Sequence, residues 1–174
     1  MNTRVKNMIL AALMLALSWL LPFITAINPA ISKAISPMHI PVFLCGFMCS
    51  MPWAPIVGFC APLLRSFTTG MPPLFPTALA MAFELATYGL VTTLLSRRLP
   101  KKPVFTYIAL VAAMLAGRLV WGAASLVLYG LSGSAFTFEM FLASAFIDAV
   151  PGIICHIAVI PAIILALRRA KLIK

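Results

Sequence analysis

Long apolar runs dominate this sequence and constrain its fold more than any other feature. The 174-residue chain contains several such runs, the first over residues 8–27 and the last over residues 138–167. Each has the length of about 20 residues that a helix needs to cross a hydrocarbon core of roughly 30 Å. Only 9% of the residues are charged, against about 25% in soluble domains. A soluble enzyme, a disordered chain and a disulfide scaffold are therefore excluded, as is a β-barrel, whose strands alternate apolar and polar residues. The sequence predicts an all-α integral membrane protein.

The number of spans depends on the apolar run 40–64, which contains Pro52 and Pro55. Interpreted as one helix it gives five spans, and interpreted as two short helices joined at residues 51–55 it gives six. Only the second interpretation puts the N-terminus, residues 97–102 and residues 168–174 on one face, and these carry 10 of the 13 lysines and arginines. Since cytoplasmic loops collect basic residues, we expect one domain over residues 1–174. It is a six-helix bundle with both termini cytoplasmic and with helices 2 and 3 short.

The N-terminal segment 1–26 has the basic start and apolar stretch of a signal peptide. Ile24 occupies a position that usually holds a small residue, and the apolar run is long for a signal core. We expect this first helix to be retained.

The formal net charge of +10 has a membrane explanation. Basic loops face the cytoplasm and are attracted to anionic lipid. This pattern favours the lipid bilayer, and not a nucleic acid, as the partner of the basic residues.

Three charged residues fall inside predicted spans, where an ionised side chain is costly unless it has a partner or faces a cavity. Glu84, Arg118 and Asp148 each lie about ten residues from the outer end of their span, so at 1.5 Å per residue they share one depth. We therefore expect a buried charge cluster near the midplane of the membrane. It is either a structural ion-pair network or part of a ligand site.

Two helical stripes predict a cavity beside these charges. One stripe runs over residues 114–129 and the other over residues 77–88, and at helical spacing their members face one way. They combine aromatic rings, hydroxyls and charges, as the wall of a site for a small polar molecule does. The alternative is ordinary packing with interfacial aromatic residues. The members are Met114, Arg118, Trp121, Ser125 and Tyr129, with Thr77, Glu84 and Tyr88.

Basic and imidazole groups near the outer face could bind an anion. Arg65 would lie near the outer end of its helix, with Lys33 and His39 in an outer loop. Arg65 has no acidic residue at its depth, so we expect it to be the leading contact for a substrate carboxylate, with Arg118 in reserve. The alternative for Arg65 is snorkelling to lipid headgroups. His156 is deep and isolated, which favours a satisfied core imidazole over a proton relay.

Catalytic and metal-binding motifs are missing from the sequence. There is no GxxxxGK[ST] loop, GxSxG or HExxH, and the four cysteines lack the neighbouring ligands of a zinc pattern. The sequence thus predicts neither an enzyme nor a cofactor. The small residues Ala12 and Ala16, four apart, would let another transmembrane helix approach closely.

Six short segments form a characteristic combination: residues 36–41 (SPMHIP), 44–46 (LCG), 61–65 (APLLR), 71–78 (MPPLFPTA), 82–89 (AFELATYG) and 116–122 (AGRLVWG). Through these segments the chain resembles, over nearly its whole length, the substrate-binding S components of energy-coupling factor (ECF) vitamin transporters.

This resemblance implies a multi-pass subunit of a prokaryotic plasma membrane that binds a water-soluble vitamin. Its partners would be a transmembrane coupling subunit, docked at Ala12 and Ala16, and two ATPases. The chain is most similar to the pantothenate branch, with pyrimidine- and pyridoxine-like branches as alternatives. Relatives are expected to carry an amide side chain where this chain has Asp148. The resemblance therefore leaves the charge balance of the site, and the ligand, open. A different class is a self-sufficient secondary transporter or channel, in which Glu84, Asp148 and His156 would relay protons.

Overall fold

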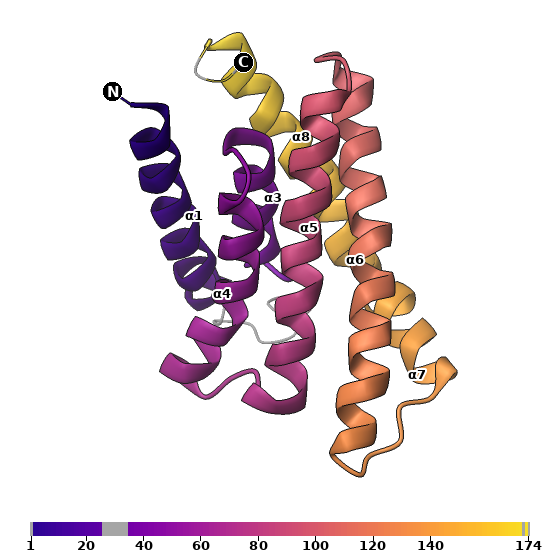
Figure 1. The fold of residues 1–174 in the computed structure, drawn as a ribbon. Helices are drawn as coiled ribbons and strands as arrows, with labels where there is room; N and C mark the ends of the chain where they lie inside the picture. Colours follow the sequence, from indigo (N-terminus) through magenta and orange to yellow (C-terminus); the bar gives the residue numbers. More distant parts are fainter. Residues whose placement is uncertain (1, 26–34, 172, 174) are drawn as a thin grey trace.

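The computed structural model describes residues 2–25, 35–171 and 173, and every regular element within them is a helix. Figure 1 shows these helices as one elongated bundle. This confirms the predicted all-α class. The elements are α1 (Thr3–Thr25), α3 (His39–Met48), α4 (Trp53–Thr69), η1 (Leu74–Ala78), α5 (Leu79–Arg98), α6 (Pro103–Leu131), α7 (Phe138–Leu142), η2 (Ala143–Ile147) and α8 (Val150–Arg169), where η1 and η2 are short π-helical turns.

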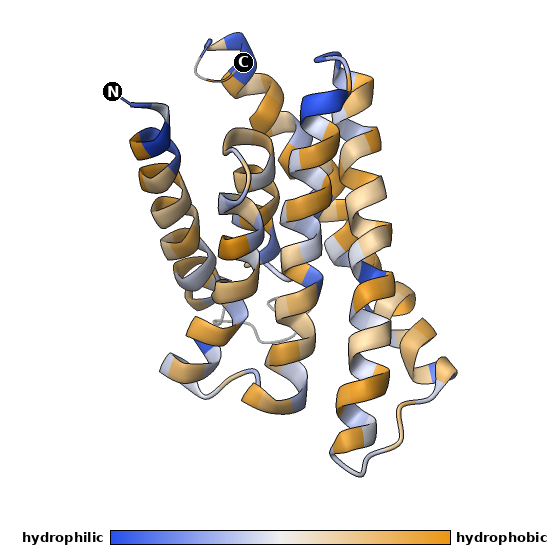
Figure 2. Cartoon of the chain, viewed as in Figure 1, coloured by the Kyte–Doolittle hydropathy of each residue, from blue (hydrophilic) through white to orange (hydrophobic). Residues whose placement is uncertain are grey.

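Apolar side chains cover the outside of the bundle. Leu119, Val127 and Ile154 are each at least 60% exposed, and apolar colour covers most of every long helix in Figure 2. A surface of this kind suits hydrocarbon and not water. Four helical segments are long and apolar enough to cross a membrane: Thr3–Ile24, Leu74–Arg98, Pro103–Leu131 and Phe138–Arg169. The chain is therefore a multi-pass membrane protein.

The apolar run 40–64 divides into two helices, as expected. α3 ends at Met48 and α4 begins at Trp53, because Pro52 has no N–H to continue the first helix. The turn is fixed to the start of α1, since the Asn7 side-chain amide donates to Ser50 Oγ. α3 and α4 are shorter than the other long helices of the bundle, also as expected.

Both ends of the described chain lie at the same end of the bundle as the α5–α6 turn (Figure 1). Arg168 near the end of α8 donates from Nη1 to Thr106 Oγ1 at 3.0 Å. Lys101, in the turn between α5 and α6, donates from Nζ to the Ser96 carbonyl oxygen at 2.5 Å. Figure 2 shows hydrophilic colour at the ends of α1, α5 and α8 on this side. We call it the basic end.

α5 is the central helix of the bundle and packs against α3, α4 and α6. Its approach to α4 depends on two glycines. A Cβ at Gly58 would lie 2.2 Å from the Leu85 carbonyl oxygen, and a Cβ at Gly89 would lie 2.5 Å from that of Ala54. Any larger residue would separate the two helices. This packing fixes α5 with its polar face toward α6.

The last apolar run is helical and long enough to cross a membrane, as expected, but it contains a π-helical turn that the sequence-based prediction did not include. The π-helical turn η2 interrupts it between α7 and α8. Pro151, in the first turn of α8, cannot donate the backbone hydrogen bond that a continuous α-helix requires. Asp148 therefore lies at the end of the π-helical turn, where it is exposed.

Candidate functional site

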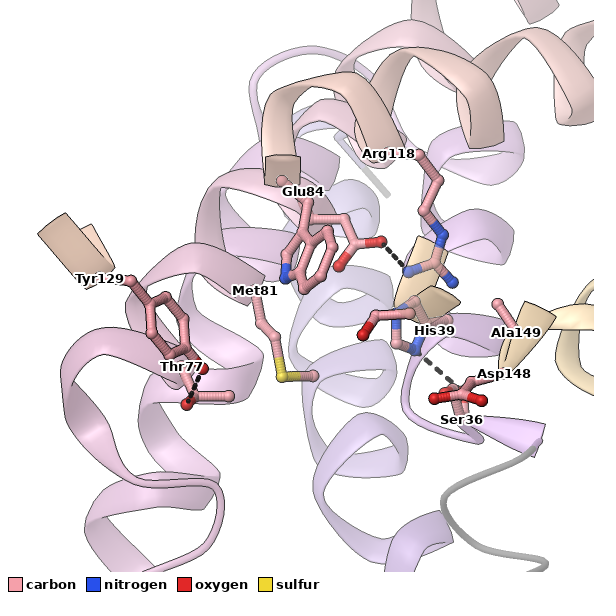
Figure 3. Close-up of a pocket in the computed structure, with 11 residues that line it drawn as sticks. Ser36, His39, Thr77, Met81, Glu84, Arg118, Tyr129, Asp148 and Ala149 are labelled. Carbon is pink, nitrogen blue, oxygen red and sulfur yellow. Dashed lines mark hydrogen bonds and ion pairs between the residues drawn. The ribbon is translucent and has the colours of Figure 1, made fainter. Parts of the chain in front are cut away.

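A cavity of about 640 Å³ lies between α3, η1, α5, α6 and the segment from η2 to the turn before α8. Among the predicted site residues, His39, Glu84, Arg118, Trp121 and Asp148 line it, and Figure 3 shows the cavity. Its size is that of a site for a small molecule. The lining residues are Ser36, His39, Thr77, Met81, Glu84, Arg118, Trp121, Tyr129, Ser144, Asp148 and Ala149.

An ion pair forms the polar centre of the cavity. Arg118 Nη1 lies 3.0 Å from Glu84 Oε1, and Tyr88 donates its hydroxyl to the same oxygen at 2.5 Å. Glu84 is 1% exposed, so these two donors replace the water that the carboxylate has lost. Of the two acidic residues expected at its depth, Glu84 and Asp148, Arg118 pairs with Glu84.

The ring of Tyr88 is fixed on several sides. It stacks on Phe43 with ring centroids 4.6 Å apart and lies 5.7 Å from the ring of His39. A Cβ at Gly117 would lie 2.1 Å from Tyr88 Cε1, so α6 also closes on the ring. Packing therefore holds the hydroxyl of Tyr88 in place against Glu84.

Two histidines lie together beside this centre. The rings of His39 and His156 stack with centroids 5.7 Å apart, so the expectation that His156 is isolated is wrong. Sequence separation hid the pair, because α8 meets α3 only in the folded bundle. His39 was expected in an outer loop, but it begins α3 and is 4% exposed. Its Nδ1 lies 3.0 Å from the Ser36 carbonyl oxygen.

An aromatic wall supports the far side of the cavity. Trp121 contacts Phe136 edge to face and stacks on Phe141. Tyr129 stacks on Phe136 at 5.6 Å, and its hydroxyl lies 3.3 Å from Thr77 Oγ1. Neither phenylalanine was predicted as a site residue, although phenylalanines cluster in residues 136–141 just after the turn that follows α6.

Asp148 lines the cavity on the same side as His39 and Ser36 in Figure 3. It is exposed, and within residues 2–25, 35–171 and 173 its side chain makes no ion pair. The three carboxyl groups of the chain thus differ. Glu84 is buried and paired, Asp148 is unpaired at the cavity, and Glu139 is exposed on α7 outside it.

Several predicted residues lie outside the cavity lining. Arg65 is half-buried on α4, so its contact with a substrate stays a prediction. Ser125 and Met114 are buried in α6, and Ser125 Oγ has no hydrogen-bond partner in the described part of the chain. Lys33 lies outside the described residues. Tyr88 is not among the lining residues, and its hydroxyl holds the carboxylate of Glu84, which is among them.

The small residues of α1, the helix predicted to contact a partner subunit, face outward. Ala12 and Ala16 are exposed on α1, whereas Ala11 and Met14 on the opposite face are buried in the core. A close contact at Ala12 and Ala16 therefore remains available to another helix.

No curated protein and no solved structure is similar enough to match the chain. A family model does match it, over residues 6–167, and its description is ECF transporter, substrate-specific component. The match covers nearly the whole bundle, including every residue of the cavity. This is a family of substrate-binding components of transporters, and it is not an enzyme family. The chain belongs to the family of substrate-specific components of ECF transporters.

Proposed function

We propose that this chain is the high-affinity binding subunit of an ECF importer for a water-soluble vitamin or vitamin precursor. The observation that carries the proposal is the cavity, which has a paired charge centre on one side and an aromatic wall on the other. Sites for small polar molecules combine apolar walls with a few placed polar groups in this way. Pantothenate-, pyrimidine- and pyridoxine-like compounds are the substrate candidates.

Energy for uptake comes from partners in this proposal. ECF substrate-specific components work with a membrane coupling subunit and ATPases, and this chain has no phosphate-binding loop of its own. The exposed small residues Ala12 and Ala16 support docking of the coupling subunit on α1.

The proposed topology has six spans in a prokaryotic plasma membrane, with the basic end in the cytoplasm. Burial lowers the pKa of Lys101, and the charges of Arg168 and Arg97 lower it further. All three acidic residues of the chain lie between residues 84 and 148, and none lies near these three basic residues in sequence. Anionic lipid headgroups of the inner leaflet would compensate the positive charge of these basic residues.

Proton-driven transport by the chain alone has less support. The proposed relay needs Glu84, Asp148 and His156 to exchange protons. Glu84 is fixed by Arg118 and Tyr88, and His156 is not among the residues that line the cavity. The geometry favours binding over relay.

Mass spectrometry of small molecules that co-purify with the protein tests this function. We expect one vitamin-like compound from the wild type and its loss from Trp121→Ala, which removes part of the aromatic wall. Leu119→Ala, on the exposed surface of the same helix, is the matched control and should retain the compound. Equal recovery from both variants would contradict binding in this cavity.

A further inference from the structure

The charges that line the cavity do not balance. Glu84 and Asp148 contribute two carboxylates, whereas Arg118 is the only lysine or arginine among the described lining residues. Arg118 is engaged with Glu84 at 3.0 Å. Asp148 is therefore left as a carboxylate without an ion-pair partner in the described part of the chain, and it lies two residues before α8 begins.

A second acceptor lies on the same side of the cavity. His39 Nδ1 is 3.0 Å from the Ser36 carbonyl oxygen, which can only accept a hydrogen bond. The neutral ring therefore carries its proton on Nδ1, and its Nε2 is an acceptor. Asp148 and the lining residue His39 thus place acceptor groups on this side of the cavity, which suits a ligand with N–H donors.

The aromatic wall adds a requirement for shape. Trp121 and Tyr129 line the cavity, and each ring is packed on Phe136. Rings held in this way present fixed flat faces that favour a flat aromatic ligand.

We infer that the substrate is a neutral or cationic nitrogen heterocycle whose N–H donors pair with Asp148, and not a compound with a free carboxylate. This inference rests on the proposed function and deepens it by naming the substrate class. Asp148 is then the residue that determines specificity. A carboxylate ligand would face Asp148 as a like charge and would have to share Arg118 with Glu84.

Calorimetric titration of the purified full chain with three probes tests the inference. The probes are hydroxymethyl-aminopyrimidine, pyridoxine and pantothenate, and we expect at least one heterocycle to bind more tightly than pantothenate. Asp148→Asn removes the charge and keeps the shape. Loss of a charge-assisted hydrogen bond should weaken heterocycle binding by about 10- to 100-fold. Asp148→Glu restores the charge and should recover part of that loss.

Glu139→Gln is the matched control, because it neutralises an exposed carboxylate outside the cavity. It should leave every affinity unchanged. Asp148 makes no side-chain ion pair in the described residues, so its variants should fold, and thermal unfolding will verify this.

Three results would overturn the inference: pantothenate binding more tightly than both heterocycles, no binding of either heterocycle, or equal heterocycle affinity in wild type and Asp148→Asn. Tight binding of pantothenate would leave the role in vitamin uptake intact and remove only the substrate class. A chain that co-purifies with no small molecule would contradict the proposed function itself.

Discussion

Removal of Arg118 should destabilise the bundle more than removal of the whole ion pair. In Arg118→Gln the carboxylate of Glu84 stays 1% exposed and keeps only the hydroxyl of Tyr88 as a donor. Breaking a buried pair from one side costs about 3–5 kcal/mol, whereas replacing both partners is often neutral. Because Tyr88 still donates, we expect the lower end of this range, and thus a decrease in Tm of roughly 6–12 °C for a chain of this size.

The double variant Glu84→Gln/Arg118→Gln removes both charges and should recover at least half of that decrease. The assay is thermal unfolding in detergent at one fixed scan rate, because unfolding of such proteins is often irreversible. Tyr88→Phe completes the set and should cost about 1.5–3 kcal/mol, the value of a hydrogen bond to a charged group. The reasoning would be refuted if the Tm decrease of the double variant equalled the sum of the decreases of Glu84→Gln and Arg118→Gln. The two side chains would then act independently.

Four further results are expected. Gly117→Ala should destabilise the protein by about 1–3 kcal/mol through overpacking, because the new methyl group meets the fixed ring of Tyr88; an unchanged Tm would contradict the close packing of α5 on α6. Ala12→Leu with Ala16→Leu should preserve the affinity of the purified protein and abolish uptake by the assembled transporter, and a loss of affinity would show that this face packs internally. A cysteine at Lys101 should be labelled only from the cytoplasmic side, and labelling of intact cells by an impermeant reagent would exclude the proposed topology. If the titration identifies pantothenate as the substrate, Arg65→Gln should raise its Kd by about 10- to 150-fold; an unchanged Kd would then assign Arg65 to lipid anchoring.

The sequence predicted the helical class and the division of the run 40–64, because both depend on local features. Apolar length defines a span, and Pro52 ends a helix wherever the helix packs. The interruption of the last run was missed, although Pro151 marks it. An isolated proline within an apolar span is often tolerated, so the sequence did not distinguish a kink from the π-helical turn η2.

The candidate site was predicted in its polar centre and missed at its edges. Glu84, Arg118 and Trp121 share helical faces that can be read from spacing, and all three line the cavity. The stack of His39 on His156 could not be read in this way, because it joins residues of α3 and α8 that are distant in sequence. The position of Arg65 depends on how α4 rotates against its neighbours, and helical spacing within α4 does not determine that rotation.

Reconstitution in proteoliposomes tests the central claim most directly. The chain is assembled with a coupling subunit and two ATPases, and uptake is measured for an isotope-labelled form of the small molecule that co-purifies with it. The account predicts uptake that requires all the partners and ATP on the side of the basic end. Uptake by the chain alone, driven by a proton gradient and insensitive to ATP, would contradict it.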